Sequence, residues 1–221
     1  MLINGVKTTA IQFKKDIMST EKKTKPLTMI NDIFKNPILN CKVSNTEAAL
    51  EVYKEIRKKN ESRKVSNRGG YQSPLLLREE REKIFTAEVM KDILEEAINV
   101  YGWKKPVNFN IDGAWFNANE SGDYNISHRH SKSHFSFVWY LKVPDSSSGQ
   151  LILEHPDGAL IMTGLFDLER NGKNYYNSEL MQITPSEGLM VMFPASLKHR
   201  VERYEGQATR VSLAFNGSFK Q

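Results

Sequence analysis

The sequence predicts a mainly β domain with flanking helices, an α+β protein whose β part is a jelly roll or a small barrel. Three observations predict it: apolar residues at helical spacing before residue 102, short alternating segments after Pro106, and the lack of a glycine-rich nucleotide-binding motif. Of the 221 residues, 39% are hydrophobic and 26% are charged, which is the balance of a folded protein with one core.

The chain divides into an N-terminal tail and one domain. Residues 1–27 are rich in Lys and Thr without periodicity, so we expect them to be mostly disordered. We expect residues 28–221 to form a single domain, helical over 44–102 with a β core over 106–216. The only cysteine, Cys41, excludes an intramolecular disulfide, and no apolar run approaches the about 18 residues of a membrane span. These features predict a soluble protein of the reducing cytoplasm, without a membrane partner.

Two helices are predicted before the β region. Ser44 and Glu47 match a capping box, and apolar residues then recur at helical spacing, which predicts a helix over 46–59. Apolar pairs between residues 84 and 98 step by four or five positions. This spacing predicts one long amphipathic helix, from about residue 80 to Gly102, that packs its apolar face on a sheet.

The β region contains nine candidate strands, separated by Gly, Pro, Asn, Asp and Ser. They are Gly113–Asn117, Tyr124–His128, Ser133–Val143, Gln150–Glu154, Ala159–Thr163, Leu180–Ile183, Leu189–Phe193, Lys198–Arg203 and Thr209–Phe215. Eight or nine strands in about 110 residues favour a jelly roll over alternating β/α units.

The positive charge of the chain is local. Net charge is +5, and the window Lys54–Arg68 holds seven Lys or Arg against two Glu. Such a stripe could bind nucleic acid, but a solvated helix face that runs into a loop has the same composition. No aromatic residue interleaves the run after Tyr53, so we favour the solvated face over a nucleic-acid partner.

The histidines indicate a metal site. All five lie in the β region, at positions 128, 130, 134, 155 and 199. His128 and His130 are one residue apart, and alternate residues of a strand point the same way. The two imidazoles could therefore share one ion, although a surface pair on an edge strand would have the same sequence.

A second segment, Gly188–His199, favours the metal site. A glycine begins an apolar strand, a proline ends it, and a histidine opens the next strand, while Gly122 likewise precedes His128 by six residues. The two segments together resemble the paired motifs of the cupin and jelly-roll metalloproteins, whose fold is the double-stranded β-helix. In that fold these segments are neighbouring strands that close over a metal ion. The pattern often has a glutamate about four residues after the first two histidines, where this chain has His134.

Arg210 is a candidate ligand for an anion. It lies eleven residues after His199, in a segment where apolar and polar residues alternate, so that Arg210 and Ser212 share one face. An arginine inside a β-barrel is costly unless it meets an anion, and its planar fork suits a carboxylate. That carboxylate could belong to a bound ligand, with Ser212 as an added donor, or to a buried Asp or Glu.

These pieces jointly resemble a known family. The segments 115–158 and 185–216, with SNRGGYQSP at 66–74, are similar to the 2-oxoglutarate-Fe(II) oxygenase family of bacterial and phage proteins. The resemblance covers about residues 66–216 and implies a double-stranded β-helix that uses Fe(II), 2-oxoglutarate and O2. It also implies hydroxylation of a substrate, coupled to oxidative decarboxylation of 2-oxoglutarate to succinate.

The resemblance implies a ligand set. His128, His130 and His199 would be the facial iron ligands and the catalytic residues. Most members of the wider superfamily have Asp or Glu where this chain has His130, so either three histidines bind iron, or His130 stands beside the metal and a carboxylate or water completes the triad.

The resemblance also places the cosubstrate. The C5 carboxylate of 2-oxoglutarate would bind Arg210 and Ser212. Asn125 and Tyr140 would line the site for cosubstrate or substrate, although both could equally be packing residues.

Two other functions fit the same residues. A cupin-like metalloenzyme that does not use 2-oxoglutarate would take His134 as an extra ligand. A nucleic-acid-binding module with an inactive metal site would use the window Lys54–Arg68. The sequence names neither the substrate, which could be a protein or a small molecule, nor the oligomeric state.

Overall fold

The protein is described here by a computed structural model, which covers residues 36–104, 107–156, 158 and 178–220. The expected disordered tail, residues 1–27, and the predicted strand Ala159–Thr163 lie outside the described residues. Within the described part of the chain, no helix is both long enough and apolar enough to cross a membrane.

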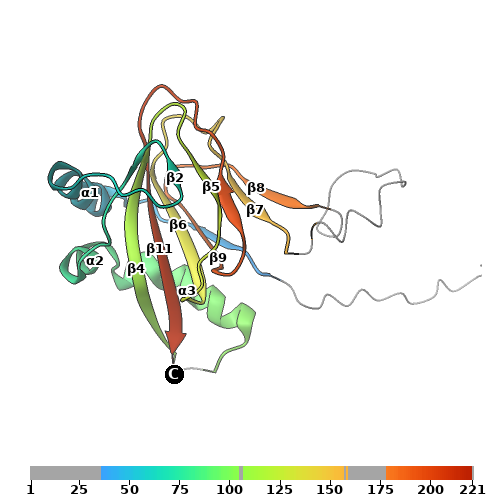
Figure 1. The fold of residues 1–221 in the computed structure, drawn as a ribbon. Coiled ribbons are helices and arrows are strands. Elements are labelled where there is room, and N and C mark those ends of the chain that lie inside the picture. The colour runs from blue at the N-terminus through green and yellow to red at the C-terminus, as the bar shows by residue number, and fades with distance from the viewer. Residues whose placement is uncertain (1–35, 105–106, 157, 159–177, 221) are drawn as a thin grey trace, which may run out of the picture. The chain divides into compact units, whose positions relative to one another are not determined.

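Two antiparallel sheets form the β part (Figure 1). The major sheet has the order β1-β9-β6-β11-β4-β3, and the minor sheet has the order β2-β5-β10-β7-β8. The major sheet consists of β1 (Leu39–Lys42), β3 (Tyr71–Gln72), β4 (Asn108–Asn119), β6 (Phe135–Lys142), β9 (Leu189–Pro194) and β11 (Arg210–Lys220). The minor sheet consists of β2 (Asn67–Arg68), β5 (Tyr124–His128), β7 (Leu151–Glu154), β8 (Leu180–Ile183) and β10 (His199–Val201). This arrangement confirms the predicted double-stranded β-helix.

The alternating segment at Arg210 becomes the central strand of the major sheet. β11 lies between β4 and β6, so Leu213 pairs with Phe116 on one side and with Trp139 on the other. Both faces of β11 are covered, and Leu213 and Phe215 are fully buried on the face opposite Arg210. The strand continues to Lys220, beyond the end of the predicted core at residue 216.

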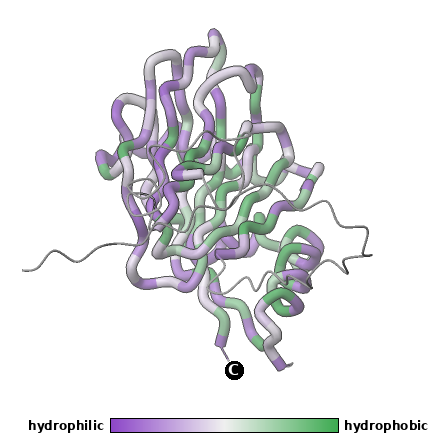
Figure 2. Tube along the Cα trace, turned by 90° about the vertical axis from the view of Figure 1, so that its right-hand side faces the viewer, coloured by the Kyte–Doolittle hydropathy of each residue, from purple (hydrophilic) through white to green (hydrophobic). Residues whose placement is uncertain are grey.

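Three helices precede the long strands: α1 (Glu47–Lys59), α2 (Arg78–Ile84) and α3 (Ala87–Tyr101). α1 and α3 each bury one apolar stripe, and these stripes share a hydrophobic core with Phe116, Phe137 and Phe215 of the major sheet. Figure 2 shows the hydrophobic positions gathered along the central strands, with hydrophilic ones on the connecting loops. The expected packing of helices on a sheet is confirmed.

Two predictions about the helices were wrong in detail. The expected long helix is broken at Phe85 and Thr86, because Thr86 has an extended backbone and its hydroxyl accepts a hydrogen bond from the Val89 N–H at 3.3 Å, which starts α3. The expected capping box at Ser44 is also absent: Thr46 is the residue before α1, and no side chain caps it. Gly102, with φ 66°, ends α3 as predicted.

A glycine turn joins the two sheets near the site. β2 pairs with β5 of the minor sheet, and β3 pairs with β4 of the major sheet, so Gly69 and Gly70 bridge them. Both glycines have positive φ, and a Cβ at Gly69 would overlap the carboxylate of Asp123. This turn therefore links β2, the edge strand of the minor sheet, to β3, the edge strand of the major sheet.

Candidate active site

The fold brings three histidines together. His128 ends β5, His199 begins β10, and the two are direct neighbours in the register of the minor sheet. His130 follows β5, and its backbone N–H donates to the Ala195 carbonyl at 2.8 Å. One candidate ligand atom from each residue lies within 4.8 Å of the other two, and no carboxylate of the described residues joins this histidine cluster (His128, His130 and His199).

Hydrogen bonds fix the ring orientation of two members of the cluster. His128 Nδ1 lies 2.8 Å from the Ile126 carbonyl, and His199 Nδ1 lies 2.9 Å from the Leu197 carbonyl. A carbonyl oxygen only accepts, so each Nδ1 carries the proton and donates, and each Nε2 keeps a free lone pair. Metal-binding histidines are oriented in this way, so the donor set fits a metal ion.

Burial keeps the cluster neutral. Desolvation, reinforced by the neighbouring imidazoles, lowers the pKa of His199 to about 3 and that of His130 to about 4, and desolvation also lowers the pKa of His128. All three rings are therefore unprotonated at neutral pH. Neutral imidazole is the form that binds a divalent ion.

These pKa values predict how the stability of the metal-free protein depends on pH. Below about pH 6.5 the unfolded chain protonates His199 while the folded chain does not, so the free energy of unfolding falls as the pH falls. The contribution of His199 is up to about 1.4 kcal/mol per pH unit between pH 6.5 and 4. Urea unfolding with a chelator at pH 7, 6 and 5 measures it. His199→Gln should give a shallower dependence, and equal slopes would contradict this account.

A pocket between the two sheets contains the histidine cluster and the other predicted residues. It has about 580 Å³ of empty volume, including its opening. All seven predicted site residues line it: Asn125, His128, His130, Tyr140, His199, Arg210 and Ser212. Ser212 is level with Tyr140 and Asn117 on the neighbouring strands, as expected for residues that share a face.

Arg210 is buried in this pocket without an acidic partner. It is 2% exposed, and its Nη1 donates to the Gly149 carbonyl while Nη2 donates to Asn119 Oδ1 at 3.1 Å. Its buried Nε has no partner, and none of the ion pairs among the described residues involves Arg210. Among the described residues, Arg210 therefore has no Asp or Glu partner. A desolvated, uncompensated cation that faces a pocket fits an anionic ligand such as 2-oxoglutarate.

Tyr140 and Asn125 lie at opposite walls of the pocket. Burial raises the pKa of Tyr140 to about 12, an effect that the charge of Arg210 partly opposes, so its hydroxyl is a neutral donor. Asn125 Nδ2 donates to Ser66 Oγ at 3.0 Å, which fixes the amide on β5. Both residues are polar groups of the pocket rather than members of the hydrophobic core clusters.

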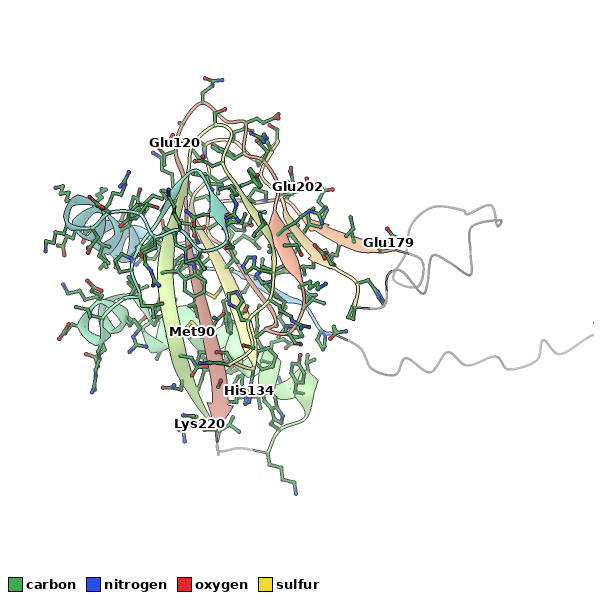
Figure 3. The ribbon with its side chains drawn as sticks, viewed as in Figure 1. Met90, Glu120, His134, Glu179, Glu202 and Lys220 are labelled. Carbon is green, nitrogen blue, oxygen red and sulfur yellow. The ribbon has the colours of Figure 1, made fainter. Side chains whose placement is uncertain are left out.

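His134 lies away from the cluster. Its backbone N–H donates to the Gly217 carbonyl at 3.1 Å, and its Nδ1 accepts from the Phe219 N–H at 3.3 Å. Figure 3 places His134 near Lys220, at the end of the strands opposite Glu120. The interpretation of His134 as an extra metal ligand was wrong, because its ring already binds the far end of β11.

Several pocket residues were missed at the sequence level. Trp115, Ser136 and Asn216 line the pocket from β4, β6 and β11, and Asn119 binds Arg210. The sequence did indicate Asn216, because it is an even number of residues from Arg210 and Ser212 and so lies on the same face of the strand. Gly149, which accepts the other Arg210 hydrogen bond, lies on a loop and gave no such signal.

Comparisons with known proteins agree with this geometry. A family model described as "Putative 2OG-Fe(II) oxygenase" matches residues 113–216. Among curated proteins, none matches this chain.

Solved structures with the same fold include three from bacteria. An oxidoreductase of the 2OG-Fe(II) oxygenase family from Burkholderia pseudomallei has 12% identity and a TM-score of 0.53 over 82% of this chain and 85% of its own. A prolyl-4-hydroxylase from Pseudomonas putida has 15% identity and a TM-score of 0.51 over 82% and 92%. HygX from Streptomyces hygroscopicus, with nickel, 2-oxoglutarate and hygromycin B bound, has 9% identity and a TM-score of 0.52 over 82% of both chains. At these identities the likeness extends to the fold.

Proposed function

We propose that this chain is a member of the 2OG-Fe(II) oxygenase family, whose model matches residues 113–216, that its histidine cluster binds Fe(II), and that Arg210 binds the C5 carboxylate of 2-oxoglutarate. One observation carries the proposal: three neutral imidazoles line the same pocket as a buried arginine that has no acidic partner among the described residues. When bound, Fe(II), 2-oxoglutarate and O2 supply the oxidising chemistry, in which 2-oxoglutarate becomes succinate and CO2 and the substrate is hydroxylated.

A three-histidine iron site is part of this proposal. The cluster contains three ring nitrogens and no carboxylate of the described residues, which supports His130 as a ligand in place of the usual Asp or Glu. Imidazole suits Fe(II), and two Nε2 lone pairs are already oriented by backbone carbonyls. His130 would complete the set from the segment after β5.

The cosubstrate would be oriented by residues at one end of the pocket. Arg210 offers a planar fork for the carboxylate, and Ser212 and Tyr140 add hydroxyl donors on the same face of the major sheet. Asn125 would contact the cosubstrate from the minor sheet. Apolar side chains, including Phe193, line the pocket beside these polar groups.

An anaerobic titration tests the proposal. Addition of 2-oxoglutarate to the Fe(II) protein should produce the weak visible charge-transfer band of the chelated cosubstrate, and air should then allow succinate to form. If no band forms at millimolar 2-oxoglutarate, the proposal is wrong.

Gly149 gives a further test, because Arg210 packs directly on it. A Cβ at Gly149 would overlap Arg210 Nη1 and lie 2.9 Å from Cζ. Gly149→Ala should therefore displace the guanidinium and raise the 2-oxoglutarate requirement about tenfold, the effect of weakening one hydrogen bond to a charged group. Steady-state titration of 2-oxoglutarate measures this change.

Gly102→Ala is the matched control. Gly102 has φ +66°, close to the +68° of Gly149, but a Cβ there meets nothing within 4 Å. Both variants should lose about 1 to 2 kcal/mol of stability from left-handed backbone strain. Only Gly149→Ala should change the 2-oxoglutarate requirement, and an equal change in both variants would contradict the role given to Arg210.

We also propose that the substrate is not a nucleic acid. The basic window Lys54–Arg68 is largely exposed, but its aromatic neighbours are not free for stacking, because Tyr71 is buried beneath the Arg57 guanidinium, 4.2 Å from the ring centroid. Salt-dependent binding to DNA or RNA at low salt that survives loss of His128 and His199 would favour the nucleic-acid module instead.

A cytoplasmic location and a protein or small-molecule substrate belong to the same proposal. The proposed location rests on cysteine usage: Cys41 is the only cysteine, so the chain has no intramolecular disulfide that would require an oxidising compartment.

A further inference from the structure

Three contacts surround the guanidinium of Arg210. Its Nη1 donates to the Gly149 carbonyl, and its Nη2 donates to Asn119 Oδ1. Its Cζ lies over the ring of Tyr204, 4.8 Å from the ring centroid. Hydrogen bonds from a guanidinium lie in its plane, so these two hold the ends of the fork. The ring meets the face of the guanidinium, so it limits how far that plane can tilt.

The side chain of Tyr204 is itself held in place. It is fully buried, and its hydroxyl donates to the Ala208 carbonyl at 2.7 Å. Because a carbonyl oxygen only accepts, the hydroxyl keeps its proton, and Arg210 meets a neutral ring. A Cβ at Gly206 would overlap the hydroxyl and the ring of Tyr204, so only glycine leaves room for them there. The ring therefore has little freedom to move.

Backbone hydrogen bonds join the three contacts into one unit. The Gly149 N–H donates to the carbonyl of Arg203, the residue directly before Tyr204, at 3.1 Å. The Tyr204 N–H donates to the Asp123 carbonyl at 2.9 Å, in the turn that follows Asn119 at the end of β4. The three groups that touch the guanidinium are therefore carried by segments that are bonded to one another.

Tyr204 can affect a ligand only through Arg210. Arg210 lines the pocket, whereas Tyr204 is not among the described residues that do so. A bidentate match to a carboxylate requires one orientation of the guanidinium fork. Arg210 is 2% exposed, and a cation–π contact is strongest where the cation is removed from water. The ring is therefore placed to hold the fork in one orientation before a ligand binds.

We infer that Tyr204 is a positioning residue for the cosubstrate: its ring fixes the tilt of the Arg210 guanidinium, so that the fork is ready for the C5 carboxylate of 2-oxoglutarate. A side chain that is already oriented loses less conformational freedom when the ligand binds, so the affinity is higher. The inference rests on the proposed function, because Arg210 must bind that carboxylate for Tyr204 to act through it.

Two 2-oxo acids test this role by binding rather than by turnover. 2-Oxopentanoate has the carbon chain of 2-oxoglutarate with a methyl group in place of the C5 carboxylate, so it can chelate a metal but cannot pair with Arg210. Anaerobic titration of the Fe(II) protein, followed by the charge-transfer band, gives a dissociation constant for each acid. The unmodified protein should prefer 2-oxoglutarate, and the ratio of the two constants measures the contribution of the carboxylate.

Variants of the ring should change this preference. Tyr204→Leu removes the ring, so it should raise the dissociation constant of 2-oxoglutarate about tenfold and leave that of 2-oxopentanoate nearly unchanged. Tyr204→Phe keeps the ring and should restore the preference to within about twofold, although loss of the bond to Ala208 should lower the melting temperature.

Gly206→Ala tests the same contact with Tyr204 and Arg210 both retained. Gly206 is not among the glycines with positive φ, so the added methyl group acts by crowding the ring and not by straining the backbone. The preference should fall about three- to tenfold. This variant carries the test if Tyr204→Leu does not fold.

Tyr71→Leu is the matched control. Tyr71 is also buried and also has an arginine over its ring, with Arg57 Cζ 4.2 Å from the centroid, and neither residue is among those that line the pocket. The variant should lose stability but keep the preference for 2-oxoglutarate.

The possible failures are distinguishable. If no band forms, or if the unmodified protein binds the two acids equally, the proposed function is wrong. If the preference exists but Tyr204→Leu keeps it, or Gly206→Ala where that variant does not fold, this inference alone is overturned. The same holds if Tyr204→Leu weakens both acids equally, if Tyr204→Phe loses the preference as fully, or if Tyr71→Leu lowers it as much.

Discussion

His199→Ala is expected to abolish Fe(II) binding, whereas His134→Ala should leave the iron affinity close to that of the unmodified protein. His199 is a member of the histidine cluster, 5% exposed, and its Nδ1 is held by the Leu197 carbonyl. Loss of a ligand should exceed the roughly 10- to 100-fold cost of losing a group that only orients a ligand. Anaerobic Fe(II) titration measures both variants.

His134→Ala is the matched control for this experiment. It removes an imidazole that accepts from the Phe219 N–H, so a small loss of thermal stability is expected from that one hydrogen bond. Equal losses of iron affinity in the two variants would show that the geometric separation of His134 from the cluster does not hold for the loaded protein.

Arg210→Met should raise the 2-oxoglutarate requirement roughly thirtyfold or more while iron affinity changes little. The substitution keeps length and apolar bulk but removes a desolvated guanidinium, and truncation of such a charge pair typically costs about 2 to 5 kcal/mol of binding. Dependence on 2-oxoglutarate, iron content and melting temperature should be measured on one preparation.

The hydrogen-bond partners of Arg210 determine how Arg210→Met should affect stability. The Gly149 carbonyl and Asn119 Oδ1 lose their donor, so the melting temperature should fall somewhat. Arg210→Lys, which keeps the charge but not the fork, should recover stability more than 2-oxoglutarate binding. A folded, iron-loaded Met variant with unchanged 2-oxoglutarate dependence would remove Arg210 from the site.

The candidate site was largely predictable because it is built on strands. Alternation placed Arg210 and Ser212 on one face. The same rule could have found Asn216. The expected pairing of His128 and His130 is observed, but not through alternation, because His130 lies after the end of β5 and its backbone N–H is bound by the Ala195 carbonyl. Eight predicted strands correspond to β4 through β11, because turn residues separate them clearly.

What the sequence could not provide depends on contacts between distant segments. The short strands β1, β2 and β3 carry little local signal and exist because they extend neighbouring strands, as β3 does beside β4. The break before α3 depends on one hydroxyl at Thr86, inside a continuous apolar pattern. That Gly149 and Asn119 bind the Arg210 guanidinium, with no acidic partner among the described residues, could be seen only in the folded structure.

The central position of β11 has a consequence for how the protein is made. β4 and β6 are separated in the major sheet until β11 lies between them, and the pairing of Arg210 with Asn119 spans 91 positions of the chain. A nascent chain that stops before residue 210 contains the whole histidine cluster, but one edge of β4 and one edge of β6 have no partner strand. Long unpaired strand edges are prone to aggregate. Because β11 fills the centre of the major sheet, the sheet can close only after β11 has left the ribosome. Pairing between such distant segments is also slow.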